Sequence, residues 1–254
     1  MRKQHILCLG FCILALCFLM TACGSAAEEE TAPDETAAAT ESKTTEENVE
    51  EEVMNPTLLY QGHGSVRIVT GEDKVIYVDP FAGEGYDLTA DLILETHGHY
   101  DHVQTDLIAS RAEDCLTITY NEALTEKNYD LGYVQVEAVQ AGNNKNHSID
   151  ECVGYVLTFS NGKKVYLSGD TSKTDQMAEM ADMSIDYAFF CCDGIYNMDL
   201  EEAAECARLV GAKHNIPYHI VDAKDDSHFS MERAEQFDAP NKLILQPGEE
   251  LTIE

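Results

Sequence analysis

The segment from His97 to His102 constrains this chain more than any other part of its sequence. It reads His-Gly-His-Tyr-Asp-His, which places three imidazoles and one carboxylate within six residues. The apolar run 92–94 before it is typical of a buried strand, and a helix-compatible segment, 103–111, follows it. Ligands commonly bind beyond the carboxyl ends of strands in layered α/β folds. Because imidazole and carboxylate suit zinc and similar divalent ions, the segment predicts a metal site rather than a merely solvated polar loop.

Other side chains of the types that bind metals lie at or beside the ends of further apolar runs. They are Asp79, His147, Asp170 and His219. An Asn-Gly pair at 161–162, the strongest short hairpin signal, lies between His147 and Asp170. Such a repeated arrangement is hard to obtain by accident, so these residues are expected to share one site with the His97–His102 segment.

The expected secondary structure begins with hairpins and continues with alternating strands and helices. Strands are expected at 57–60, 65–70, 74–78, 92–95, 116–119, 133–138, 155–160, 164–167, 187–190, 214–217 and 242–245. Helices are expected at 174–180, 200–210 and 230–236, besides the segment 103–111. This order predicts an α/β or α+β fold, in which helices pack on the outer faces of sheets.

The order and spacing of these residues resemble the five motifs of the metallo-β-lactamase superfamily. Several short segments further resemble its branch containing ascorbate-6-phosphate lactonase and related hydrolases. They are Gly62-His63-Gly64-Ser65, Asp79-Pro80, Gly154-Tyr155, Gly169-Asp170-Thr171 and Ile216-Pro217-Tyr218-His219. The resemblance covers nearly all of residues 56–254 and implies a single-domain αββα sandwich with two metal ions at the strand ends.

The resemblance also implies a role for each candidate ligand. The first metal would be held by three histidines: His97, His99 and His147. The second metal would be held by Asp101, His102 and His219. Asp170 would bridge both ions, because a carboxylate has two oxygens. Zinc is the expected metal, and manganese and iron are alternatives, since a ligand set of histidines and aspartates admits all three.

Other polar residues receive supporting roles. Asp79 is expected to accept a hydrogen bond from a ligand imidazole and fix its tautomer, with a simple strand-end turn as the alternative. His63 either faces the substrate or caps a turn, and Asp193 follows a strand and is expected near the pocket. His214 and His228 are expected to be structural or solvated.

These assignments predict a hydrolase. Two metal ions would lower the pKa of a bridging water and supply hydroxide near neutral pH, and this hydroxide would attack a carbonyl carbon or a phosphorus. Asp101 would orient the nucleophile and help to protonate the leaving group. Lactones, esters, thioesters and phosphodiesters are all candidate substrates. A β-lactamase is disfavoured, since the usual zinc β-lactamases lack a bridging aspartate at the position of Asp170.

The first residues predict export. Arg2 and Lys3 precede the apolar run 6–20, which is too short for an ordinary membrane span. Small residues before Cys23 resemble a bacterial lipobox, so 1–22 is expected to be a lipoprotein signal peptide and Cys23 the lipidated residue. A plain secretory signal is the alternative. An acidic tether, 23–55, would then connect the lipid on the extracytoplasmic face of the cell membrane to the domain at 56–254.

The composition of the chain narrows the range of molecules that it is expected to bind. The formal net charge is −31 and stays strongly negative without the tether, which argues against nucleic acid and for a small-molecule substrate. The oligomeric state stays open. Irregularly spaced cysteines are expected to be mostly buried thiols: Cys115, Cys152, Cys191, Cys192 and Cys206. A metal- or solute-binding surface lipoprotein without catalysis is the competing function, although the domain lacks the His-rich loop typical of metal capture.

Overall fold

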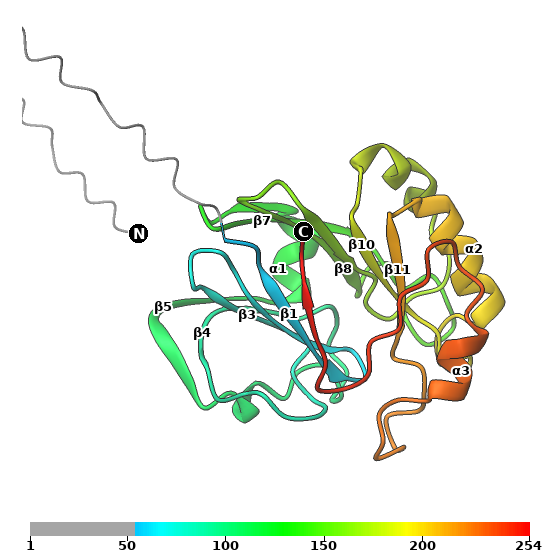
Figure 1. Ribbon diagram of the computed structural model, residues 1–254, viewed down its shortest axis with the longest axis horizontal. Helices are drawn as coiled ribbons and strands as arrows, with labels where there is room; N and C mark the ends of the chain where they lie inside the picture. Colours follow the sequence, from blue (N-terminus) through cyan, green and yellow to red (C-terminus); the bar gives the residue numbers. More distant parts are fainter. Residues whose placement is uncertain (1–53) are drawn as a thin grey trace, which may run out of the picture. The chain divides into compact units, whose positions relative to one another are not determined.

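Two six-stranded sheets form the core of the computed structural model, which describes residues 54–254 (Figure 1). The predicted signal peptide, Cys23 and the tether as far as residue 53 lie outside the described residues. No helix in the described part of the chain is long and apolar enough to cross a membrane.

The first sheet has the strand order β12-β1-β2-β3-β4-β5. Its strands are β1 (Thr57–Gly62), β2 (Ser65–Val69), β3 (Val75–Val78), β4 (Thr89–Leu94), β5 (Ser110–Ile118) and β12 (Glu250–Thr252). β3 and β4 run parallel, with Val78 opposite Leu94. The residues that follow these two strands, Asp79 and the His97–His102 segment, therefore leave the sheet at the same edge.

The second sheet has the order β11-β10-β9-β8-β7-β6. Its strands are β6 (Asn128–Asp130), β7 (Val134–Gln140), β8 (Val153–Phe159), β9 (Lys164–Leu167), β10 (Tyr187–Cys191) and β11 (His214–Tyr218). β9, β10 and β11 are parallel neighbours, and Cys191 lies opposite Tyr218. Asp170, Asp193 and His219 each follow one of these strands, so the topology gathers them at one edge.

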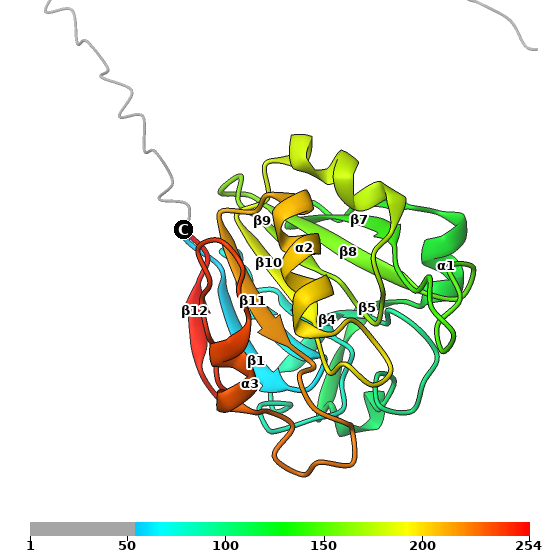
Figure 2. The same cartoon turned by 90° about the vertical axis from the view of Figure 1, so that its right-hand side faces the viewer.

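The helices are short. They are α1 (Tyr120–Thr125), α2 (Leu200–Val210), α3 (Met231–Gln236) and two 3₁₀ helices, η1 (Thr105–Leu107) and η2 (Asp175–Met183). α2 begins at Asp199, whose side chain accepts a hydrogen bond from the Glu202 amide, and ends at Gly211, whose φ is +67°. Its apolar face packs on the outer face of the second sheet beside β10 (Figure 2).

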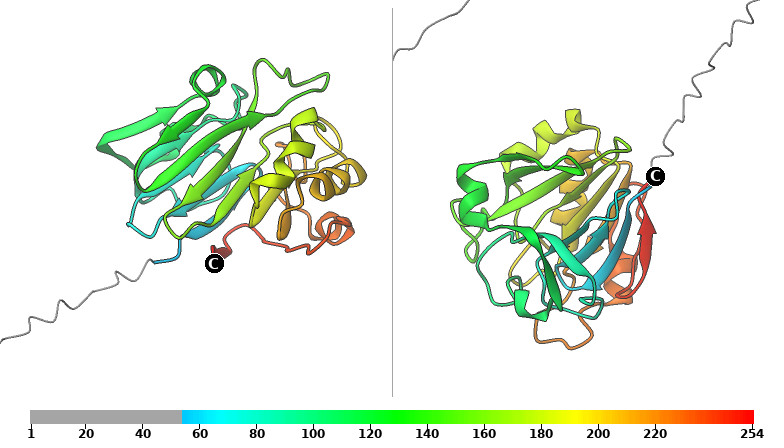
Figure 3. Two further views of the ribbon diagram at one scale, coloured as in Figure 1. Left: turned by 90° about the horizontal axis from the view of Figure 1, so that it is seen from above. Right: turned by 90° about the vertical axis from the view of Figure 1, so that its left-hand side faces the viewer.

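Apolar side chains from the inner faces of both sheets make one continuous core, and Figure 3 shows the sheets as facing layers. β3 buries all of its residues, because a smaller apolar cluster around Tyr77 and Ile93 covers the outer face of the first sheet. Two hydrogen bonds join the sheets near the site: the Tyr155 hydroxyl donates to the Glu95 carbonyl (2.9 Å) and the Val153 amide donates to the Thr96 carbonyl (2.9 Å). The predicted single-domain sandwich of two facing sheets is confirmed.

Some predicted elements are wrong. The expected helix 103–111 contains only the single turn η1, because Ser110 already pairs with β4 as the first residue of β5. The expected helix 174–180 is the 3₁₀ helix η2. The expected last strand 242–245 makes only one isolated bridge, from Lys242 to Asn215, whereas β12 closes the first sheet against β1. The unpredicted elements α1, β6 and β12 are too short to show a hydrophobic period.

Two tyrosines on neighbouring strands test the link between the sheets. Tyr155→Phe removes the hydroxyl that spans to Glu95, so we expect the free energy of unfolding to fall by about 1 kcal/mol. Tyr166→Phe is the matched control, since the buried Tyr166 hydroxyl has no hydrogen-bond partner among residues 54–254. Denaturant unfolding of the control should show unchanged or greater stability. Equal destabilisation by both substitutions would contradict this account.

Candidate metal centre

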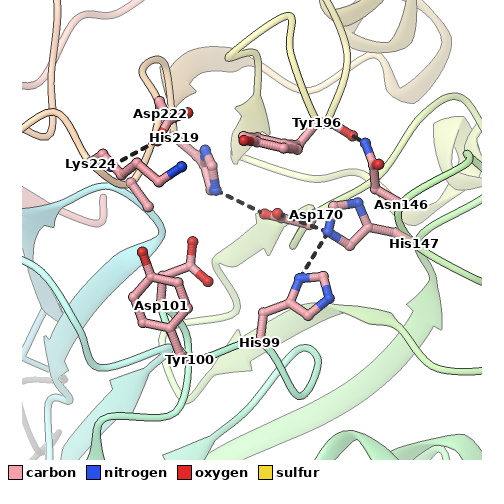
Figure 4. A pocket seen from close by; sticks show the side chains of 11 residues that line it. His99, Tyr100, Asp101, Asn146, His147, Asp170, Tyr196, His219, Asp222 and Lys224 are labelled. Atoms are coloured by element: carbon pink, nitrogen blue, oxygen red, sulfur yellow. Dashed lines mark hydrogen bonds and ion pairs between the residues drawn. The ribbon is translucent and has the colours of Figure 1, made fainter.

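The predicted ligands converge from both sheets at the edge where the parallel strands end. Figure 4 shows several of them around one cavity, with Asp170 between His147 and His219. Five of these side chains are buried, although aspartate is usually exposed in proteins. They are His97, His102, His147, Asp170 and His219, and the neighbouring His63 is buried as well. His99 is exposed and Asp101 is partly exposed, and both line the cavity.

Three histidines form the first group. His97 Nε2 lies 3.0 Å from His99 Nδ1, and His147 Nε2 lies 3.2 Å from the same atom. All three ring nitrogens lie within 4.8 Å of one another, which is close enough to share one ion. This is the trio predicted from the sequence for the first metal.

Four residues form the second group, in which each offers a ligand atom within 4.8 Å of the others: His63, Asp101, His102 and His219. The sequence predicted all of these except His63, which it placed facing the substrate or capping a turn. In the structure His63 Nε2 lies 3.2 Å from Asp101 Oδ2, and its ring centroid lies 3.6 Å from that of His219. His63 is therefore a further candidate ligand or a direct support for Asp101.

Asp170 faces both groups with different oxygens. Its Oδ2 lies 3.3 Å from His147 Nε2 and 3.9 Å from His97 Nε2. Its Oδ1 lies 3.3 Å from His219 Nε2 and 3.5 Å from His102 Nε2. One oxygen of the Asp170 carboxylate thus faces the first group and the other oxygen faces the second group, as is required of a bridging ligand.

Unsatisfied atoms indicate what the site would hold. His102 Nε2, His219 Nε2 and Asp170 Oδ1 are buried and make no hydrogen bond within the described chain. Buried polar atoms normally have partners, so a cluster of unsatisfied nitrogen and oxygen atoms facing one another is unusual. Imidazole nitrogens and carboxylate oxygens are the ligands that zinc and related divalent ions take. The residues present therefore fit the metal ions that the sequence predicted.

The protonation states suit metal binding. Burial lowers the pKa of His97 to about 3 and that of His102 to about 4, so both rings are neutral at pH 7, as a ligand imidazole must be. Burial opposes ionisation of Asp170, but the neighbouring His219 and His102 hold its pKa well below the usual range. Burial also lowers the pKa of His219, but the Asp170 carboxylate outweighs this and raises it to about 9. Metal binding at His219 must therefore displace a proton at neutral pH.

Asp79 orients His102, as the sequence predicted. Asp79 Oδ2 lies 2.8 Å from His102 Nδ1, which leaves His102 Nε2 directed toward Asp170. Thr96, which the sequence did not single out, donates to Asp79 from its amide (2.8 Å) and from its hydroxyl (2.6 Å). Burial raises the pKa of Asp79 to about 7, against the opposing influence of His97 and the Thr96 hydrogen bonds.

Asp193 lies next to the pocket but does not line the cavity itself. It is buried beneath His219, with its Oδ2 3.6 Å from His219 Nδ1. Arg233 of α3 fixes this region by donating to the carbonyls of Asp193 (3.0 Å), Cys192 (2.8 Å) and Ile220 (2.9 Å). These contacts join the loops after β10 and β11, and no local sequence signal marked Arg233 for this role.

The loop that carries His147 is held by hydrogen bonds within it and by a bridge beside Asp170. Gly142 forms a parallel bridge with Thr171, directly beside Asp170. Within the loop, the Asn144 side chain accepts hydrogen bonds from the amides of Asn146 (2.8 Å) and His147 (2.9 Å). This turn aims His147 into the first group.

Gly64 allows a ligand to approach closely. A Cβ atom at Gly64 would lie 2.9 Å from Cε1 of the His102 ring. Any other residue would therefore push His102 away from Asp79 and Asp170.

The remaining histidines and cysteines lie outside the two groups. His214 stacks on Tyr187 with ring centroids 5.0 Å apart, and His228 packs edge-on against Phe81 at 5.3 Å. The five described cysteines are free, and all but Cys115 are buried, as predicted. Cys191 donates weakly to the Thr171 carbonyl (3.5 Å) and contributes no ligand atom to either group.

Known proteins are similar to this chain in sequence and in fold. Residues 57–219 match the family described as the beta-lactamase superfamily domain. A UPF0173 metal-dependent hydrolase of Geobacillus thermodenitrificans is 30% identical over 225 residues, covering 76% of this chain and 98% of that protein. One from Natranaerobius thermophilus is 28% identical over 225 residues, covering 77% of this chain and 99% of that protein.

Solved structures agree. A Parabacteroides distasonis protein described as a metal-dependent hydrolase has a TM-score of 0.61 and 27% identity, covering 75% of this chain and 91% of that chain. A Thermotoga maritima protein is described as a zinc-dependent hydrolase of the metallo-β-lactamase superfamily. It has a TM-score of 0.54 and 22% identity, and the match covers 72% of this chain and 84% of that chain. The chain belongs to the metallo-β-lactamase superfamily. Within it, the chain is a member of the UPF0173 metal-dependent hydrolase family.

Removing the shared carboxylate should change the number of bound ions. We expect Asp170→Ala to retain at least one metal ion fewer per chain than the unsubstituted protein, because both groups lose an oxygen. Elemental analysis after dialysis and calorimetric titration would measure this. Asp222→Ala is the control, since Asp222 lines the same cavity but belongs to neither group. An unchanged metal content in Asp170→Ala would show that the bridging assignment is wrong.

Proposed function

We propose that this protein is a dinuclear metal hydrolase that cleaves a small lactone, ester or phosphodiester outside the cytoplasm. The observation that carries the proposal is the placement of the two Asp170 oxygens, one toward each group of candidate ligands. Membership of a family of metal-dependent hydrolases supports the reaction class.

The chain offers two neighbouring metal positions. The first would be held by His97, His99 and His147, and the second by Asp101, His102 and His219, with His63 beside them. Zinc is the proposed metal, because the ligands combine imidazole and carboxylate and a related protein is described as zinc-dependent. When bound, such ions supply an activated water and stabilise negative charge on the reacting oxygen.

Asp101 is the proposed proton-handling residue. It lines the cavity, and its side chain is 15% exposed, whereas Asp170 is 5% exposed. Burial opposes ionisation of Asp101, but the hydrogen bond with His63 and the nearby His102 hold its pKa well below the usual range. A carboxylate that faces substrate can orient the attacking water and carry a proton toward the leaving group.

The cavity that opens onto the site favours a catalytic role over metal storage. A cavity of about 430 Å³ opens onto both groups and is lined by His99, Asp101, His147, Asp170 and His219. Catalytic metal sites keep a position open to substrate, whereas structural sites are closed by protein ligands. The competing proposal, a metal- or solute-binding lipoprotein without turnover, has no comparable support among the described residues.

The site chemistry also bears on the substrate. Bridging by Asp170 favours lactone, ester or phosphodiester cleavage over β-lactam cleavage, and the Gly62–Ser65 and Ile216–His219 segments favour the lactonase-like branch. The acidic chain, with a net charge of −31, disfavours nucleic acid. A small-molecule substrate is therefore proposed.

The proposed location rests on the sequence of residues 1–55. A signal peptide at 1–22, lipid on Cys23 and an acidic tether would anchor the domain on the extracytoplasmic face of the cell membrane. Fractionation of cells that express the chain tests this. The unsubstituted protein should sediment with membranes, and Cys23→Ser should not. Soluble unsubstituted protein, or membrane-bound Cys23→Ser, would contradict the anchor.

A substrate panel tests the activity. We expect the zinc-loaded chain to hydrolyse at least one member of a panel containing γ-lactones, phenyl esters and bis(p-nitrophenyl) phosphate. A chelator should abolish turnover and added zinc should restore it, because the reaction requires the ions. Stoichiometric metal binding without hydrolysis of any member would favour the non-catalytic binder instead.

A further inference from the structure

One positively charged side chain at the cavity has no role in either metal group. Lys224 is the single lysine or arginine among the described residues that line the cavity. Figure 4 shows its side chain extending from the loop after β11, with the amino group on the side of His219. The ammonium makes no ion pair with any carboxylate of residues 54–254, although the chain carries 47 acidic residues and only 16 basic ones.

The loop after β11 fixes the backbone of Lys224 but provides no ion pair for the positive charge of its side chain. The Asp222 side chain accepts a hydrogen bond from the Lys224 backbone amide (2.8 Å), and the Asp222 carbonyl accepts one from the Asp225 amide (2.9 Å). These bonds form a local turn and leave the Lys224 ammonium free. The other carboxylates of the cavity, Asp101 and Asp170, belong to the metal groups.

Two exposed tyrosines also line the cavity. They are Tyr100, which is 58% exposed, and Tyr196, which is 40% exposed. Asn146 donates to the Tyr196 carbonyl (3.0 Å), which ties the His147 loop to the loop that carries Tyr196. Exposed aromatic rings at a cavity offer flat surfaces for an apolar or cyclic part of a ligand.

We propose that Lys224 binds an anionic group of the substrate, while Tyr100 and Tyr196 contact its apolar or cyclic part. The substrate would then be a small anionic ester or lactone, whose scissile bond lies at Asp101 and Asp170 and whose carboxylate or phosphate reaches Lys224. This inference rests on the proposed hydrolase function and adds the charge of the substrate to it. Ammonium groups bind carboxylate and phosphate as point charges, and such charge-assisted hydrogen bonds are stronger than neutral ones.

The test compares an anionic substrate with a neutral one of nearly equal shape. The zinc-loaded full chain and its Lys224→Met variant are each assayed with 4-acetoxybenzoate and with its methyl ester. We expect the ratio of kcat/KM for the anionic over the neutral ester to fall roughly tenfold in Lys224→Met, which corresponds to about 1.4 kcal/mol. Lys224→Arg should restore most of the ratio. Lys145→Met is the control, because Lys145 lies beside the site but does not line this cavity.

A binding measurement separates this inference from the hydrolase proposal. Calorimetric titration with 4-hydroxybenzoate and its methyl ester reports the preference for the anion without requiring turnover. A wild-type preference that weakens about tenfold in Lys224→Met supports the role of Lys224, even if neither ester is hydrolysed. No preference in the wild type, or one that Lys224→Met and Lys145→Met leave equally intact, would overturn it. Hydrolysis of both esters with an unchanged ratio would overturn this inference alone and leave the hydrolase proposal standing.

Discussion

The site depends on one buried carboxylate that lies between two groups of imidazoles. Asp170 is buried, and its two oxygens lie 3.3 Å from His147 and from His219, which belong to different groups. Burying a charge without compensation is costly, so the Asp170 carboxylate needs positive charge beside it. Without metal ions, the Asp170 carboxylate raises the pKa of His219 to about 9, so this ring supplies positive charge beside Asp170, and bound metal ions would replace it. The same constraint explains why unsatisfied donor atoms meet at this one place.

The fold brings the candidate ligands together around Asp170 because parallel strands in each sheet end at a common edge. β3 and β4 deliver Asp79 and the His97–His102 segment, and β9, β10 and β11 deliver Asp170, Asp193 and His219. The backbone is also bent to direct side chains inward: His63, Asp79 and His219 have positive φ angles of 49°, 46° and 43°. Such left-handed conformations cost a non-glycine residue about 1–3 kcal/mol and concentrate at functional sites. The extensive core between the two sheets stabilises the fold against this strain.

The sequence predicted the metal centre better than its surroundings, for physical reasons. Chemistry-bearing side chains at strand ends leave a strong pattern, so the residues of both groups were identified except His63, whose turn at Gly62–Gly64 gave no sign of its direction. α2 was predicted at its observed bounds because it is long, amphipathic and capped at both ends. The segment 103–111 was misread because pairing between β4 and β5 overrides a weak helical pattern. Thr96 and Arg233 act through long-range contacts that a single sequence does not encode locally.

The central claim is that Asp170 joins two metal positions. The most direct measurement is anomalous diffraction at the zinc absorption edge from crystals of the zinc-loaded protein. The account predicts two anomalous peaks on opposite sides of the Asp170 carboxylate, one among His97, His99 and His147 and the other among Asp101, His102 and His219. A single peak, or two peaks of which neither contacts Asp170, would contradict it.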